Sequence, residues 1–111
     1  MTAEALERTL GATIEIQELT LDYFRKFDLH ETARMMGEKH LAMRGRFDKI
    51  SKALGSAMED KDREVLEAEL QPFMDALVDW EKDRTLVLTA VNEALGYATR
   101  LAERSAEQGQ D

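Results

Sequence analysis

The chain has 111 residues, of which 43% are hydrophobic and 34% are charged, with one proline and no cysteine. This length fits one domain, and the lack of cysteine excludes a disulfide framework, thiolate zinc sites and a cysteine nucleophile. The formal net charge of -8 is the opposite of the basic footprint of a nucleic-acid-binding protein, so we expect no nucleic acid among the partners.

The N-terminal residues lack the basic, apolar and small-residue order of a signal peptide. Nowhere do eighteen apolar residues follow one another, as a membrane-spanning helix requires. We therefore expect a cytoplasmic protein with no membrane insertion.

The fold class follows from the scarcity of helix-breaking residues and from the periodicity of the apolar residues. Glycine and proline are scarce, helix-favouring residues dominate, and no stretch alternates apolar and polar residues as a strand does. The sequence predicts an all-α protein, an antiparallel three-helix bundle or coiled-coil hairpin with one long C-terminal helix. Its single helical domain would cover residues 1–104, followed by a polar C-terminal tail over residues 105–111.

The first predicted helix runs from about residue 3 to 26. Its apolar seam follows steps of three and four residues, and consists of Leu6, Leu10, Thr13, Gln17, Leu21 and Phe24. A second apolar edge on the same helix consists of Ile16, Leu19, Tyr23 and Phe27.

The second predicted helix covers residues 29–54. Its seam is the most regular of the chain and consists of Ala33, Met36, His40, Met43, Phe47, Ile50 and Leu54. Nine residues separate Phe24 from Ala33, which turns the apolar face by about 180° and predicts a break between the two helices. Asp28 and Glu31 resemble a capping box, and Gly55 suits a left-handed residue after the helix end.

The third predicted helix covers residues 61–104, with Ser56 and Glu59, or Asp60 itself, as its cap. Its seam keeps the same rhythm for five heptads, through Leu66, Leu70, Phe73, Leu77, Trp80, Arg84, Val87, Val91, Ala94, Ala98 and Leu101. Pro72 lies inside this pattern and cannot donate a helical hydrogen bond. It predicts a kink near Gln71, or a break into a short helix over 61–70 and a longer one from 72.

The predicted helix lengths do not match. At 1.5 Å per residue the three helices measure about 36, 39 and 66 Å, so the second can cover the third only to about Leu86. Beyond that point an apolar ridge has no partner in a simple hairpin. Its predicted contact residues are Val87, Val91, Leu95, Ala98 and Leu101, with Leu88 and Tyr97 at the rim.

Two interpretations of this ridge stay open. An uncovered apolar stripe of this length exceeds what monomers usually expose, which favours contact with another chain. If residues 61–70 fold away at Pro72, however, the remaining helix is about 50 Å long and the bundle covers itself.

Polar residues interrupt the seams at Gln17, His40 and Arg84. Together they could bind an anionic metabolite, as three-helix chorismate mutases do, but polar seam residues more often fix register or reach solvent at the edge. Neither histidine has a glutamate three residues before it, and no HExxH or GK[ST] motif occurs. The sequence therefore predicts no metal site, no cofactor and no enzyme.

Two stretches carry a family resemblance. FDLHETARMMGEKHLAM (27–43) resembles the short Asp-Leu turn and charged amphipathic second helix of flagellar export chaperones of the FlgN and FliT type. LEAELQPFMDALVDWEKDRTLVLTAVNEAL (66–95) resembles their long helix, with a proline near its start and a charged segment before an apolar run. The chain departs from them in lacking a long C-terminal extension.

The resemblance implies a non-enzymatic chaperone for type III protein export in flagellum biogenesis. It would bind a helical segment of a secreted client, prevent premature assembly and deliver the client to the export gate. Two alternatives remain: a structural coiled coil in which the ridge closes a homodimer, and a small all-helical enzyme of the chorismate mutase type.

Overall fold

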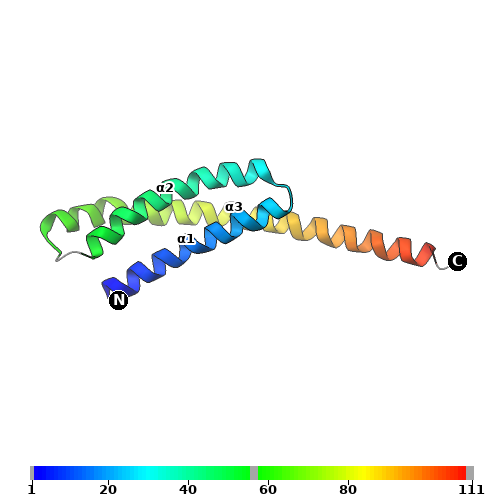
Figure 1. Ribbon diagram of the computed structural model, residues 1–111, viewed down its shortest axis with the longest axis horizontal. Helices are drawn as coiled ribbons and strands as arrows, with labels where there is room; N and C mark the ends of the chain where they lie inside the picture. Colours follow the sequence, from blue (N-terminus) through cyan, green and yellow to red (C-terminus); the bar gives the residue numbers. More distant parts are fainter. Residues whose placement is uncertain (1, 56–57, 110–111) are drawn as a thin grey trace. The chain divides into compact units, whose positions relative to one another are not determined.

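The computed structural model describes residues 2–55 and 58–109. These residues form three helices and no strand, and 92% of them are helical, which confirms the all-α prediction. The helices are α1 (Ala3–Lys26), α2 (His30–Leu54) and α3 (Asp60–Gln108), as Figure 1 shows. The predicted bounds are met within one residue except at the end of α3, which continues four residues past the predicted 104.

The chain divides into two compact units, residues 1–81 and residues 82–111. The first unit contains α1, α2 and the N-terminal part of α3, while the second is the rest of α3 and the chain end. Each unit is described by itself below.

A capped start and a left-handed residue define the ends of α1. The hydroxyl of Thr2 accepts a hydrogen bond from the Ala5 amide at 3.1 Å, as an N-cap does. At the other end Asp28 has φ 59°, and the Leu29 amide donates to the Phe24 carbonyl at 3.2 Å. This is the Schellman arrangement, which ends a helix and reverses the chain.

The predicted capping box at Asp28 is wrong. Asp28 belongs to the termination of α1, and Leu29 is the N-cap of α2, without a side-chain capping bond. The break between the helices nevertheless occurs where the change of apolar phase predicts it. Asp tolerates the left-handed region better than most residues, so no glycine is needed here.

The other two helix ends also differ in detail from the expectation. Gly55 follows α2 in a right-handed conformation, with φ -82° and ψ -5°, so it is not the left-handed residue we predicted. At the start of α3 the Asp62 carboxylate accepts a hydrogen bond from the Glu59 amide at 2.9 Å, one half of a capping box. The predicted cap Ser56 lies outside the described residues.

Helix α3 is continuous through Pro72. The predicted alternative, a short helix over 61–70 and a separate one from 72, is therefore wrong. Pro72 cannot donate to the Ala68 carbonyl, but one missing hydrogen bond in a 49-residue helix leaves the flanking turns bonded.

Polar contacts between side chains show how the helices of the first unit run. The Ser51 hydroxyl donates to Glu7 at 2.6 Å and Arg44 to Glu18 at 3.4 Å, so α1 and α2 are antiparallel. A second set of contacts joins α2 to the first unit's part of α3 in the same sense: Lys39 to Asp79 at 3.1 Å and Arg46 to Glu69 at 2.7 Å. The basic middle helix thus pairs with acidic neighbours on both sides.

Most of the core of the first unit lies on the predicted seams, although Ile14 and Ala53, which lie off them, are also buried. The largest fully buried side chains are Trp80, Phe24, Phe73, Met43, Ile50 and Gln17. The indole N–H of Trp80 donates to the Met36 carbonyl at 3.0 Å, so its one polar atom is satisfied. Burying each of the large apolar side chains contributes about 1.5–3 kcal/mol to folding.

Candidate functional site

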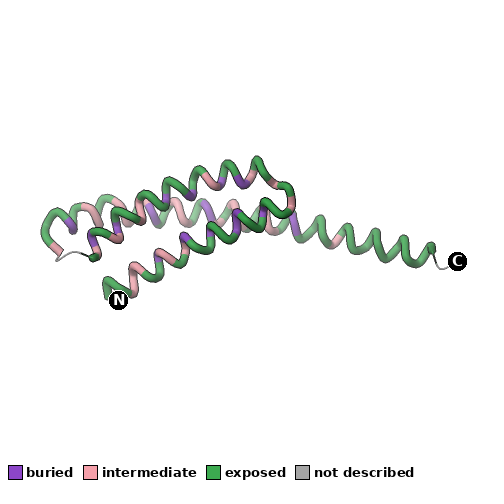
Figure 2. The backbone as a smooth tube through the Cα atoms, viewed as in Figure 1, coloured by how far each residue is buried: buried purple, intermediate pink, exposed green. Residues whose placement is uncertain are grey.

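The predicted ridge lies on the second unit, and its residues differ in exposure (Figure 2). Val87 and Leu88 are half-buried, whereas Leu95, Tyr97, Ala98 and Leu101 are exposed. Val91 is only 7% exposed, so the expectation of an uncovered ridge fails at this position.

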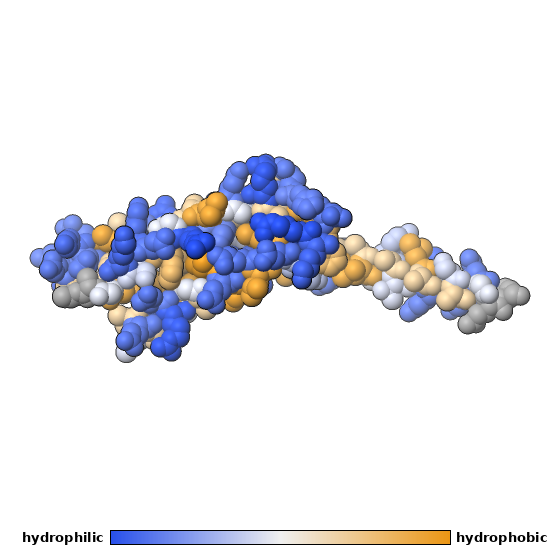
Figure 3. All heavy atoms as spheres, in the orientation of Figure 1, coloured by the Kyte–Doolittle hydropathy of each residue, from blue (hydrophilic) through white to orange (hydrophobic). Residues whose placement is uncertain are grey.

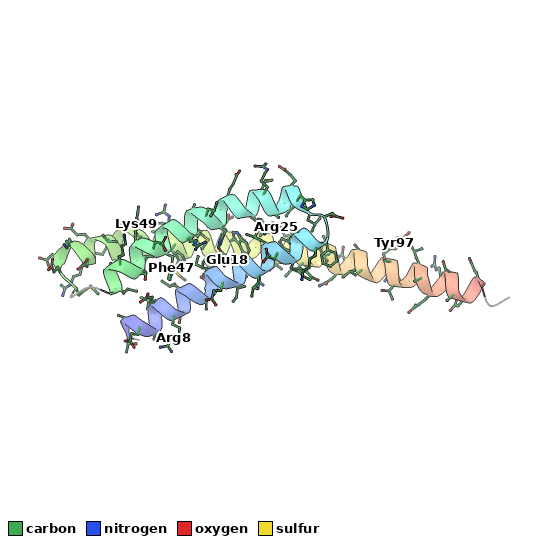
Figure 4. The ribbon with its side chains drawn as sticks, in the orientation of Figure 1. Arg8, Glu18, Arg25, Phe47, Lys49 and Tyr97 are labelled. Carbon is green, nitrogen blue, oxygen red and sulfur yellow. The ribbon has the colours of Figure 1, made fainter. Side chains whose placement is uncertain are left out.

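The bare part of the ridge therefore begins after Val91. From residue 92 to 109 every residue is exposed except Gly96, which is half-buried. We call Leu95, Ala98 and Leu101, with Tyr97 at the rim, the C-terminal ridge; Figure 3 shows apolar side chains along this segment, and Tyr97 is labelled in Figure 4. Leu95 and Leu101 remain 45% and 43% exposed.

The charged side chains of this segment all avoid the ridge. Between 92 and 108 they are Glu93, Arg100, Glu103, Arg104 and Glu107. At about 100° per residue each lies about 120° or more around the helix from the middle of Leu95, Ala98 and Leu101, and Arg104 is the one beside Tyr97 at the rim. The ridge is thus an apolar, uncharged helix face with solvated charges behind it.

A second bare apolar stripe lies on α1. Ile16, Leu19 and Tyr23 are 44%, 69% and 37% exposed, although all of them are large and apolar. The Tyr23 ring contacts the half-buried Phe27 ring edge-on, with centroids 4.9 Å apart. The sequence shows this stripe as a second apolar edge of the helix, but nothing in the spacing alone distinguishes it from core.

The structure brings together two of the three polar seam residues. The ring Nδ1 of His40 lies 2.7 Å from the Gln17 amide oxygen, and the Gln17 amide N–H donates to the Met43 sulfur at 3.2 Å. Gln17 and His40 are 0% and 4% exposed. Because the amide oxygen can only accept, this arrangement assigns the proton to Nδ1 of His40. Arg84 is half-buried in the second unit.

Two charged groups face the other nitrogen of His40. Its Nε2 lies 3.6 Å from the Glu18 carboxylate, which also contacts Arg44 at 3.4 Å. Burial lowers the pKa of His40, with Arg44 adding to this effect and Glu18 opposing it. The neutral ring therefore acts as a hydrogen-bonding core residue that joins α1 to α2, rather than as a proton donor open to substrate.

An open groove of about 700 Å³ lies beside this cluster, between α1 and α2. Its apolar wall includes Ile14 and Phe47, and a Cβ at Gly11 would lie 3.4 Å from the Phe47 ring. Figure 4 shows Phe47, Glu18 and Arg8 around it. The groove is open to solvent, and most of its lining residues are charged, among them Arg8, Glu18 and Arg44.

No three His, Asp or Glu side chains of the described residues gather where they could hold a metal ion. Within the same part of the chain, no helix combines the length and the apolar character that crossing a membrane would take.

The chain was also compared with known proteins. No protein-family model, no curated protein and no solved structure matches it. The geometry of the chain itself therefore carries the functional argument.

Proposed function

We propose that the protein is a non-enzymatic binding protein that captures an amphipathic helix of a partner on its C-terminal ridge. The observation that carries the proposal is the bare, uncharged face of residues 92–108, with Leu95 and Leu101 each more than 40% exposed. An amphipathic helix laid along such a face buries its own apolar stripe at the same time.

The stability of the segment supports the same proposal. Helices of about 12–15 residues are marginal in water unless an apolar face packs against another element. Residues 92–108 are helical yet exposed nearly all round. A bound partner helix would add the packing that this segment lacks.

The more specific proposal is a cytoplasmic chaperone of type III flagellar export. It is supported by the resemblance of residues 27–43 and 66–95 to chaperones of the FlgN and FliT type. The client is then the terminal helical segment of a secreted subunit, which the ridge keeps from assembling before export.

A photo-reactive residue placed on the ridge in the native cell tests the proposal. We expect the probe at Ala98 to cross-link one protein through a terminal amphipathic helix, and the same probe at Arg100, on the opposite face, to give no such product. For the chaperone proposal, that partner must be a secreted protein that stays monomeric when mixed with this chain. No specific product at Ala98, or equal products at both positions, would reject helix capture.

A substitution on the ridge provides the quantitative test. Leu95→Asp should change the free energy of unfolding by no more than about 0.5 kcal/mol, because the residue is largely exposed. It should weaken partner binding at least about tenfold, since it places a carboxylate in an apolar contact. Arg100→Asp is the matched control and should leave binding within about twofold. Binding by Leu95→Asp that equals the wild type would contradict the proposal.

A further inference from the structure

We propose that two copies of this chain form a reciprocal dimer, in which the C-terminal ridge of each packs antiparallel against the bare stripe on α1 of the other. Because it uses the ridge of the proposed function, this inference rests on that ridge being a helix-docking surface. It adds the occupant of a second surface, the stripe on α1, for which the proposed function has no role.

The stripe on α1 is a complete helical seam. It extends from the first turns of the helix to its C-cap, and consists of Ala5, Thr9, Ala12, Ile16, Leu19, Tyr23 and Phe27. We call these residues the outer seam. They carry no charge and follow steps of three and four, and the middle ones are exposed. At 1.5 Å per residue the outer seam is about 33 Å long, enough to receive the roughly 25 Å of residues 92–108.

The spacing of the two faces matches in one antiparallel register. Steps of four, three and four join Ala12, Ile16, Leu19 and Tyr23, and the same steps in reverse join Ser105, Leu101, Ala98 and Ala94. Each residue of the first series then faces its counterpart in the second. Leu19 and Tyr23 meet the small residues Ala98 and Ala94, and Ile16 meets Leu101. Leu95 of the C-terminal ridge lies at the edge of this contact, about 90° around the helix from its middle.

The charges beside the two faces agree with the same register. The charged side chains of α1 lie on one flank of the outer seam. In an antiparallel pair of helices, that flank meets the corresponding flank of the partner helix. In this register Glu15 approaches Arg104, the charged residue of the segment that lies nearest the contact face. This approach joins opposite signs, which favours this register.

A second copy of the chain satisfies both bare faces at once. In a two-fold dimer the contact occurs twice, because each copy contributes a ridge and an outer seam. Stable specific interfaces cover about 800 Å² on each partner, and two helix contacts approach that area more readily than one. A foreign helix on the ridge would leave the outer seam exposed.

Cross-linking between different molecules tests the contact directly, because the chain has no cysteine of its own. Leu19→Cys and Ala98→Cys are prepared as separate proteins, mixed and oxidised. We expect a disulfide-linked heterodimer in high yield. Leu19→Cys mixed with Ser105→Cys, one heptad or about 10 Å out of register, and Leu19→Cys mixed with Arg100→Cys should each give markedly less.

The mass in solution gives the second measurement. We expect the wild-type chain to have twice its 12.7 kDa mass at micromolar concentration, and Leu19→Asp to return it to the single-chain mass. Leu19 is 69% exposed, so this variant should remain folded, which circular dichroism checks. Glu15→Arg should weaken the dimer, and adding Arg104→Glu to that variant should restore it.

A wild-type monomer across micromolar concentrations, or equal cross-linking in all three mixtures, would overturn the dimer. The dimer and the client can fail separately. A monomer whose ridge still cross-links a client helix refutes only the dimer, whereas a dimer that captures no client refutes only the proposed function. The Leu19→Asp variant separates them further, because it leaves the ridge intact.

Discussion

At the scale of single residues, the contact between Gln17 and His40 is a buried polar link between α1 and α2. The 2.7 Å bond between their side chains lies where both are buried, and Met43 accepts the remaining amide hydrogen bond. Among the described residues, no buried side-chain nitrogen or oxygen lacks a partner. Sliding the helices would leave such groups unpaired at a cost of about 1–3 kcal/mol each, so the contact helps to set the register.

The burial of His40 predicts how stability depends on pH. Because burial lowers its pKa in the folded chain, the unfolded chain takes up a proton at a higher pH than the folded chain. The stability from the neutral ring is complete above about pH 6.5 and is lost as the pH falls toward the lowered pKa. Urea unfolding should show that His40→Gln loses less stability than the wild type between pH 7.5 and 5.

The exposed His30 is the matched control for this experiment. Its side chain is 70% exposed, so His30→Gln controls for the removal of an imidazole that does not belong to the core. An acid loss in His40→Gln equal to that of the wild type would show that other groups cause the whole pH dependence.

At the scale of the helices, two helix ends differ in how well the residue type suits the backbone conformation. Asp28 adopts φ 59° at the end of α1, where an L-residue is strained. Gly55 adopts φ -82° after α2, where any residue is allowed and glycine only adds freedom to the unfolded chain. The glycine is therefore present at the end that does not require it.

Two exchanges follow from this mismatch. Asp28→Gly should stabilise the protein by about 0.5–1 kcal/mol through relief of the left-handed strain. Gly55→Ala should add about 0.4–1 kcal/mol by restricting the unfolded chain. Thermal unfolding of the two variants and of the double variant measures both effects. Destabilisation by Asp28→Gly would mean that the aspartate side chain contributes more than the strain costs.

At the scale of the whole molecule, buried side chains are concentrated in one unit. The six largest fully buried side chains all belong to residues 1–81. In the described part of residues 82–111, Val91 is the buried apolar residue and the helix beyond it is exposed. Stability should therefore vary strongly along α3.

Hydrogen exchange measures this difference. In dilute solution we expect the backbone amides of residues 92–108 to exchange far faster than those near Phe73 and Trp80, because the terminal turns lack tertiary packing. Protection of 92–108 should rise with protein concentration if the reciprocal dimer forms. Equal protection of both regions at the lowest concentration would contradict the packing described here.

Much of the fold could be predicted because helical seams are local. Steps of three and four residues identified all three helices, and the change of phase between Phe24 and Ala33 identified a break without glycine or proline. The conformations of Asp28 and Gly55 could not be predicted, since they depend on how the chain leaves one helix to enter the next. Val91 and Leu95 illustrate the same limit for the site, because both keep the seam spacing and only one is exposed.

The sequence by itself determined the three helices and the apolar faces they carry, because periodicity and propensity act between residues a few positions apart. The tertiary structure decided which faces are covered. Helix α1 carries two apolar seams, and packing buries only one of them, because a helix at the surface of a bundle cannot turn every face inward. The outer seam and the C-terminal ridge are what remains, and they are the surfaces on which the proposed partners bind.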